Sequence, residues 1–226
     1  HIIMSDVIAG GITGVLQWVI GHPIDTIKVL MQNNMKWCGL PFRQYYNGGS
    51  YKLVGSFIFN TIVFPIDDRV RTNFNIDNRF ISGGVAGVFV SLPVFLFDVC
   101  KVKRQVNKNY KIKWKDFVST PGYRMLASRE IIGCSTYFGA YQYFKDRDYG
   151  PFVSGGLAGM INWTCSYQLD LLANRQMALN IGLKEAYSMG KLWSGYGACM
   201  IRAFLVNSVS FYAYEKSKKI LDGMLD

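Results

Sequence analysis

Residues 82–87 read Ser-Gly-Gly-Val-Ala-Gly, and closely related sequences stand at residues 9–14 (AGGITG) and 154–159 (SGGLAG). The three copies therefore recur at a nearly constant interval along the chain. Each copy contains two glycines four positions apart, which on a helix would share one face and let a neighbouring helix approach closely. The pattern predicts three related helices, each packed tightly against a partner.

An aspartate follows each glycine pair at the same distance along the chain. These aspartates, Asp25, Asp98 and Asp170, keep the interval that separates the glycine pairs. Self-similarity at a fixed period is typical of a chain built from structural repeats. We therefore expect one domain over residues 1–226, divided into the repeats 1–73, 74–146 and 147–226.

Uncharged stretches within each repeat favour a membrane protein. Two of them, 80–97 and 149–169, approach the roughly 20 apolar residues that cross hydrocarbon. The later uncharged stretches are shorter and begin beside Lys52, Glu130 and Arg202, whose charges would have to face a wet cavity or one another. We therefore expect an all-α membrane protein in which six transmembrane helices surround a central cavity. The expected helices are 5–33, 50–71, 78–106, 123–146, 150–178 and 195–220, with short surface helices within 33–50, 106–122 and 178–194.

Charge and residue usage narrow the possible functions. The formal net charge of +10 favours an anionic partner, either nucleic acid, anionic lipid or an anionic solute. The recurring uncharged stretches argue against the solvated basic stripe of a nucleic-acid-binding protein. With only two histidines and five scattered cysteines, the chain offers no recognisable catalytic set, metal-ligand spacing or phosphate-binding loop. We expect neither an enzyme nor a bound cofactor.

The residues around the three aspartates resemble the motif of the mitochondrial carrier family, Pro-x-[Asp/Glu]-x-x-[Lys/Arg]-x-[Lys/Arg]-x-Gln. Residues 23–32 lack only the second basic residue, and residues 96–105 have leucine in place of proline. Residues 168–177 are the weakest match, because Ala173 and Met177 occupy the lysine and glutamine places. The resemblance covers essentially the whole chain. It implies a multi-pass exchanger of the mitochondrial inner membrane that works by alternating access, as a monomer in contact with lipid such as cardiolipin.

The same resemblance implies a gate on the matrix side. Its residues would be Asp25 paired with Lys101, Asp170 paired with Lys28, and Asp98, braced by Gln32 and Gln105. Asp98 would face Ala173 and lack a partner, so this gate should be incomplete.

A second gate is implied on the cytoplasmic side. Its pairs would be Asp68 with Lys145, Glu215 with Arg71, and Gln142 with Lys218. Because a glutamine stands where an acid is expected, the third of these links can only be a hydrogen bond. Both gates would have two strong links of three and would cost less to open.

Substrate contacts are implied midway along the even-numbered helices. Counting back from each cytoplasmic gate position by the interval typical of the family gives Gly55, Arg129 and Arg202, with the neighbours Lys52, Ser56, Glu130 and Tyr137. Arginine suits bidentate binding of phosphate or carboxylate, so the two arginines indicate an anionic group on the solute. Arg129 could instead pair with Glu130, whereas Arg202 has no acid nearby in the sequence.

Two substrate classes are considered, with nucleotides placed first and cationic or neutral amino acids second. The compact length and the abundance of Asn, Ile, Tyr and Lys are similar to those of short carriers encoded by giant DNA viruses. That resemblance implies exchange of nucleotides and deoxynucleotides in host mitochondria, for which Tyr137 and neighbouring aromatic residues offer stacking surfaces. An adjacent arginine and acid, as in Arg129 and Glu130, is instead similar to carriers of cationic or neutral amino acids. A membrane scaffold that keeps the fold without transporting is the alternative of another class.

Overall fold

The computed structural model describes residues 2–74 and 78–206, and over these ranges the chain is helical, with turns and loops between the helices. The long helices are α1 (Ile2–Gln32), α2 (Gly49–Phe74), α3 (Arg79–Val106), α5 (Tyr123–Lys145) and α6 (Pro151–Leu179). Three short helices lie between them, η1 (Phe42–Tyr46), α4 (Trp114–Ser119) and α7 (Leu183–Ser188). A further helix spans Tyr196–Val206. These elements begin and end within a few residues of the predicted ones, and the expected continuation of the last helix lies outside the described residues.

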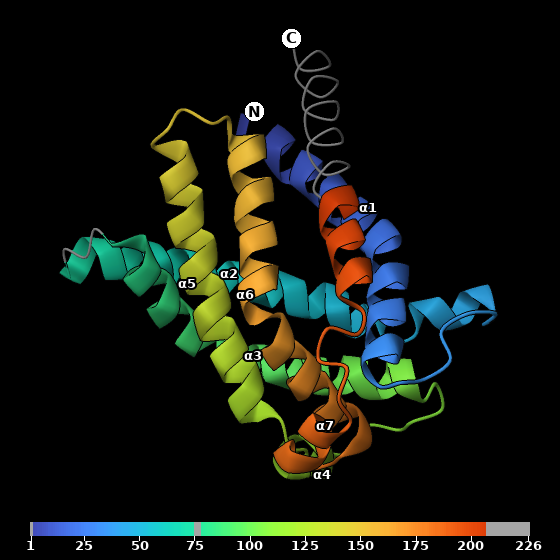
Figure 1. Cartoon of the computed structure of the whole chain (residues 1–226). Coiled ribbons are helices and arrows are strands. Elements are labelled where there is room, and N and C mark those ends of the chain that lie inside the picture. The colour runs from blue at the N-terminus through green and yellow to red at the C-terminus, as the bar shows by residue number, and fades with distance from the viewer. Residues whose placement is uncertain (1, 75–77, 207–226) are drawn as a thin grey trace.

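Long helices that follow one another in the chain from α2 to α6 pack side by side (Figure 1). α3 packs along both α2 and α5, and α5 packs along α6. The helix Tyr196–Val206 joins α6 through a hydrogen bond of 2.8 Å between the hydroxyls of Thr164 and Tyr196, and joins α1 through an ion pair between Arg202 and Asp25. In Figure 1 the short helices α4 and α7 lie together at the end of the molecule opposite the start of α1.

The glycine pair of the second repeat sets the contact between α3 and α5. A Cβ atom at Gly83 would stand 2.6 Å from the carbonyl oxygen of Cys134, and one at Gly87 would stand 2.6 Å from that of Glu130. Real Cβ atoms do not approach backbone so closely, so glycine is what lets these two helices touch. At Gly155, in contrast, an added Cβ would meet no atom of the described chain within 4 Å, so the expected close approach is not seen in the third repeat.

A buried ion pair fixes the loop between α3 and α5. The Lys103 ammonium lies 3.0 Å from Asp116 of α4, and the same carboxylate accepts hydrogen bonds from the Tyr110 hydroxyl at 2.7 Å and the Lys113 backbone N–H at 2.8 Å. Burial alone would raise the pKa of Asp116, but these donors lower the pKa to about 2. Its carboxylate is therefore charged at every physiological pH and holds α4 against the end of α3.

Arg175 has the corresponding position in the third repeat. Its side chain is fully buried, and its Nε donates to the Gln32 carbonyl at 2.6 Å while Nη1 donates to the Ala186 carbonyl at 2.9 Å. One guanidinium thereby ties α6 to the ends of α1 and α7.

By length and mean hydropathy, α3 is the one described helix that could cross a membrane on composition alone. The helix Tyr196–Val206 is apolar but shorter over its described length. α2 and α5 carry charged side chains within their length, among them Lys52 and Arg129. Charges in a spanning helix are tolerated where they face a cavity or a counter-charge. The surroundings of these charges therefore decide whether α2 and α5 are compatible with crossing a membrane.

Replacing Gly87 with alanine should destabilise the protein. The new methyl group would push against the Glu130 carbonyl, and overpacking of this kind costs roughly 1–3 kcal/mol. Gly197→Ala is the matched control, because Gly197 is exposed on a helix and an added Cβ meets nothing within 4 Å there. Thermal unfolding of the purified protein in detergent would measure both. Equal unfolding temperatures for the two variants would contradict the close contact between α3 and α5.

Candidate functional site

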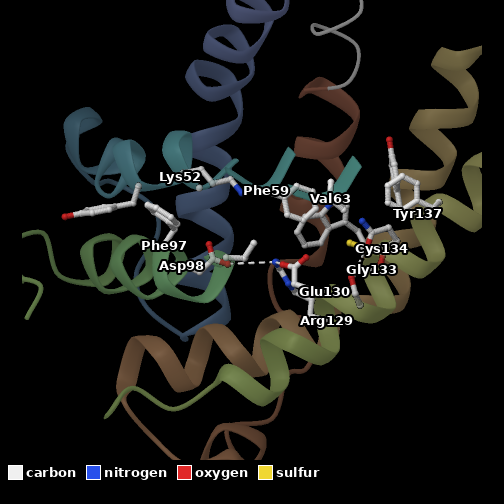
Figure 2. Close-up of a pocket in the computed structure, with 17 residues that line it drawn as sticks. Lys52, Phe59, Val63, Phe97, Asp98, Arg129, Glu130, Gly133, Cys134 and Tyr137 are labelled. Atoms are coloured by element: carbon white, nitrogen blue, oxygen red, sulfur yellow. Dashed lines mark hydrogen bonds and ion pairs between the residues drawn. The ribbon is translucent and has the colours of Figure 1, made fainter. Parts of the chain in front are cut away.

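A cavity of about 350 Å³ lies between α2, α3, α5 and α6. Figure 2 shows its charged residues facing one another, with Lys52 and Asp98 on one side and Arg129 and Glu130 on the other. Five of the seven residues expected to contact the substrate line it: Lys52, Gly55, Arg129, Glu130 and Tyr137. Arg202 is not among the lining residues, and the side chain of Ser56 lies outside the description.

Aromatic and small polar side chains complete the wall. Phe59, Phe97, Tyr137 and Trp163 line the cavity, and Asn162 and Ser166 of α6 stand opposite Gly133. Tyr137 stacks on Tyr141 with ring centroids 6.4 Å apart. The cavity therefore combines flat apolar surfaces with charges of both signs, as small-molecule sites commonly do.

Two buried ion pairs join the aspartates of the repeats to lysines of neighbouring helices. Lys28 of α1 lies 2.7 Å from Asp170 of α6, and Lys101 of α3 lies 3.7 Å from Asp25 of α1. The Lys28 and Asp170 side chains are only 5% and 6% exposed. Both pairs are the ones expected from the sequence, and together they connect α1, α3 and α6.

The third aspartate differs from the expectation. Asp98 was expected to lack a partner because Ala173 occupies the lysine place, but Nη2 of Arg129 lies 3.9 Å from its carboxylate. Arg129 also contacts Asp170, with Nη1 at 3.0 Å, and its own neighbour Glu130. A cation from α5 thus stands where the sequence predicted a gap.

Arg202 has no acid nearby in the sequence, but the fold brings one to it. Its Nε lies 2.8 Å from Asp25, which is also the partner of Lys101. The partner belongs to the first repeat, far earlier in the chain, so a search of the neighbouring sequence could not find it. Arg202 consequently belongs to the ion-pair layer rather than to the cavity wall.

Of the two glutamines expected to brace the pairs, one does so. Gln32 donates to Asp170 at 2.9 Å. Gln105 instead donates to the Thr26 hydroxyl of α1 at 3.0 Å.

Two residues of this layer were missed in the sequence. Asn174 donates to both Asp170 and Gln32, and Trp163 covers the Lys28 ammonium at 4.2 Å from the ring centroid, a favourable cation–π distance. Asn174 is one helical turn after Asp170, which is a signal that could have indicated it.

Half of the expected cytoplasmic gate lies outside the described residues. Nothing is described for Glu215, Lys218 or the side chain of Asp68, so none of the three predicted pairs is tested. Gln142 is hydrogen-bonded to Asp146 at the end of its own helix, and Lys145 is exposed. Arg71 is half-buried near the end of α2.

One end of the cavity is therefore bounded by a layer of ion-paired charges that links α1, α3, α5 and α6. Such a layer can close one end of a polar space without leaving an unpaired charge in an apolar setting. Breaking the pairs would open that end. A polar cavity closed at one end by such a layer suits a carrier of small solutes.

Comparison with known proteins agrees with this class. The family model described as "Mitochondrial carrier protein" matches residues 2–37 and 146–225. Mitochondrial substrate carrier family protein S of Dictyostelium discoideum is 26% identical over an alignment of 280 residues that covers 96% of this chain and 98% of the relative. Mitochondrial ornithine transporter 1 of Mus musculus is 25% identical, with 98% and 96% covered, and mitochondrial arginine transporter BAC2 of Arabidopsis thaliana is 26% identical, with 95% and 90% covered.

The chain belongs to the mitochondrial carrier family. It is a transporter of small solutes and not an enzyme, and it is a multi-pass protein of the mitochondrial inner membrane. The relatives named above come from an amoeba, a mouse and a plant, and they lend no support to a viral source.

Replacing Asp170 with asparagine should destabilise the protein more than any exposed charge does. It would leave Lys28 without its carboxylate and Arg129 with one fewer, and breaking a buried pair in this way costs about 3–5 kcal/mol. Asp146→Asn is a matched control at an exposed position and should change stability by no more than about 0.5 kcal/mol. Thermal unfolding in detergent would separate the two, and equal effects would mean that the buried layer does not stabilise the fold.

Proposed function

We propose that this carrier exchanges amino acids, with cationic amino acids as the preferred class. The observation that carries the proposal is the charge of the cavity. Its lining contains two basic side chains, Lys52 and Arg129, and two acidic ones, Asp98 and Glu130. A lining with balanced charge suits a zwitterion, whose own charges also balance.

The placement of the charges suggests how such a solute would lie. Among the described contacts of the cavity residues, no ion pair occupies Lys52, which leaves its ammonium free to attract a carboxylate. Arg129 is surrounded by three acids, Asp98, Glu130 and Asp170. The carboxylates of Asp98 and Glu130 in the lining favour the ammonium or guanidinium groups of a cationic amino acid, whose own carboxylate would lie between Lys52 and Arg129. Phe59 and Phe97 would cover its aliphatic part.

Relatives support the same class. Two of those reported above are named as transporters of ornithine and of arginine. Nucleotide exchange, placed first on sequence grounds, has no such support. A nucleotide brings several negative charges, and Asp98 and Glu130 would repel them within the same cavity.

The proposed mechanism is alternating access by six spanning helices arranged as three repeats around the cavity. The ion pairs among α1, α3 and α6 would serve as the matrix gate, and the ends of α2, α5 and the last helix as the cytoplasmic gate. The short helices η1, α4 and α7 would then lie on the matrix surface in contact with lipid headgroups, and the carrier would act as a monomer and an antiporter.

Uptake by vesicles reconstituted with the purified protein tests this proposal. Labelled arginine or ornithine should enter vesicles preloaded with amino acid, and labelled ATP and dATP should not. Glu130→Gln removes a carboxylate of the same size, and the loss of a charged contact, roughly 1.5–3 kcal/mol, should reduce affinity for cationic amino acids about ten- to a hundredfold. Glu185→Gln, an exposed change on α7, is the matched control and should transport normally.

Other outcomes would point elsewhere. Uptake of nucleotides that survives Glu130→Gln would overturn the amino-acid assignment. Correctly inserted protein that moves no member of either panel would favour the non-transporting scaffold.

A further inference from the structure

We propose that Arg129 completes the ring of ion pairs beneath the cavity in place of a residue at position 173, and that the carboxylate of the substrate competes with Asp98 for it. The first part concerns this chain's own closure and rests on contacts within the protein. The second part rests on the proposed function, because it requires a substrate that bears a carboxylate.

The geometry places Arg129 in two environments at once. Its side chain lines the cavity and its guanidinium reaches Asp98 of α3 (Figure 2). The same guanidinium also contacts Asp170 of α6. The distances are 3.9 Å from Nη2 to Asp98 and 3.0 Å from Nη1 to Asp170. Without Arg129, Asp98 would be the one aspartate of the three with no basic partner among the described ion pairs.

Position 173 cannot supply that cation itself. Ala173 is 1% exposed and belongs to an apolar cluster with Val99, Leu126 and Met177. The side chain of a lysine at position 173 would lie among these apolar residues, where an ammonium group is costly to bury. Position 173 therefore holds an alanine where the family motif has a lysine, and Arg129 supplies the cation beside Asp98 instead.

Substrate binding would change this arrangement for a simple reason. The guanidinium has five N–H donors in one plane, and a carboxylate binds best to two of them side by side. Nε of Arg129 has no hydrogen-bond acceptor among the described atoms, whereas Nη2 donates to Glu130, so a substrate carboxylate that takes the edge formed by Nε and Nη2 displaces Glu130 from Nη2. Because Nη2 is also the atom nearest to Asp98, occupation of that edge weakens the longest contact of the ring. Binding of the solute thereby loosens the link between α3 and α5.

A double-mutant cycle with Asp98→Asn and Arg129→Gln tests the first part. The readout is conductance across planar bilayers without any substrate, together with the unfolding temperature. Each single change should lower the unfolding temperature and raise the leak. For Arg129→Gln we expect a leak about tenfold above wild type, which corresponds to losing about 1.4 kcal/mol of closure. The double variant should leak no more than Arg129→Gln, because the two residues act as one contact.

The matched control is the cycle of Asp98→Asn with Arg202→Gln. Arg202 contacts Asp25 instead, so these two effects should add. Additive effects for Asp98 and Arg129 would overturn the proposal. If Arg129→Gln does not insert, Arg129→Lys in the same cycle keeps the charge and should leak less than Asp98→Asn.

Repeating the unfolding measurement with arginine present tests the second part. Saturating arginine should reduce the coupling between Asp98 and Arg129, whereas ATP should leave it unchanged. If the coupling is present without substrate and arginine does not change it, Arg129 still completes the ring of ion pairs. The proposed competition between the substrate carboxylate and Asp98 would then be rejected. If the coupling is intact but the protein takes up no arginine, only the proposed function would be rejected.

Discussion

Charge buried in an apolar setting is the constraint on which the rest of the structure depends. Asp25 of α1 and Asp170 of α6 are buried, and Asp98 of α3 is half-buried beside the cavity. An ionised carboxylate there is tolerable only beside a cation and hydrogen-bond donors. Each aspartate meets at least one basic side chain from another helix, and Gln32 and Asn174 add donors to Asp170. If the helices moved so that these contacts broke, several charges would lose their partners at once. The ion pairs therefore stabilise one closed arrangement of the helices.

The packing of the helices serves this layer and the cavity above it. Contact between α3 and α5 at Gly83 and Gly87 brings the backbone of Glu130 against α3, which sets how far Arg129 reaches toward Asp98. On the other side of the layer, Arg175 and the pair of Lys103 with Asp116 attach the short helices to the ends of the long ones. Local contacts therefore determine where the charges of the cavity lie, and the cavity charges in turn favour one class of solute.

The sequence predicted the helices, the pairs of Lys28 with Asp170 and Lys101 with Asp25, and most of the cavity lining. These features follow from sequence motifs that recur at a constant interval, because equal spacing along the chain places equivalent residues at the same level along neighbouring helices. Departures from the repeat were harder to interpret. Ala173 indicated a missing cation, but only the structure shows that Arg129 of another helix stands in its place. The partner of Arg202 was missed for the same reason, since contacts between repeats depend on helix tilt and rotation, which no local pattern records.

In this proposal the Arg129 guanidinium serves both to close the ion-pair layer and to bind the substrate. An experimental structure of the protein with arginine bound would test it most directly. We expect the arginine carboxylate against Arg129, with Arg129 and Asp98 separated beyond the roughly 4 Å limit of an ion pair. Arginine bound in the cavity with its carboxylate away from Arg129, and with Arg129 still beside Asp98, would contradict the proposal.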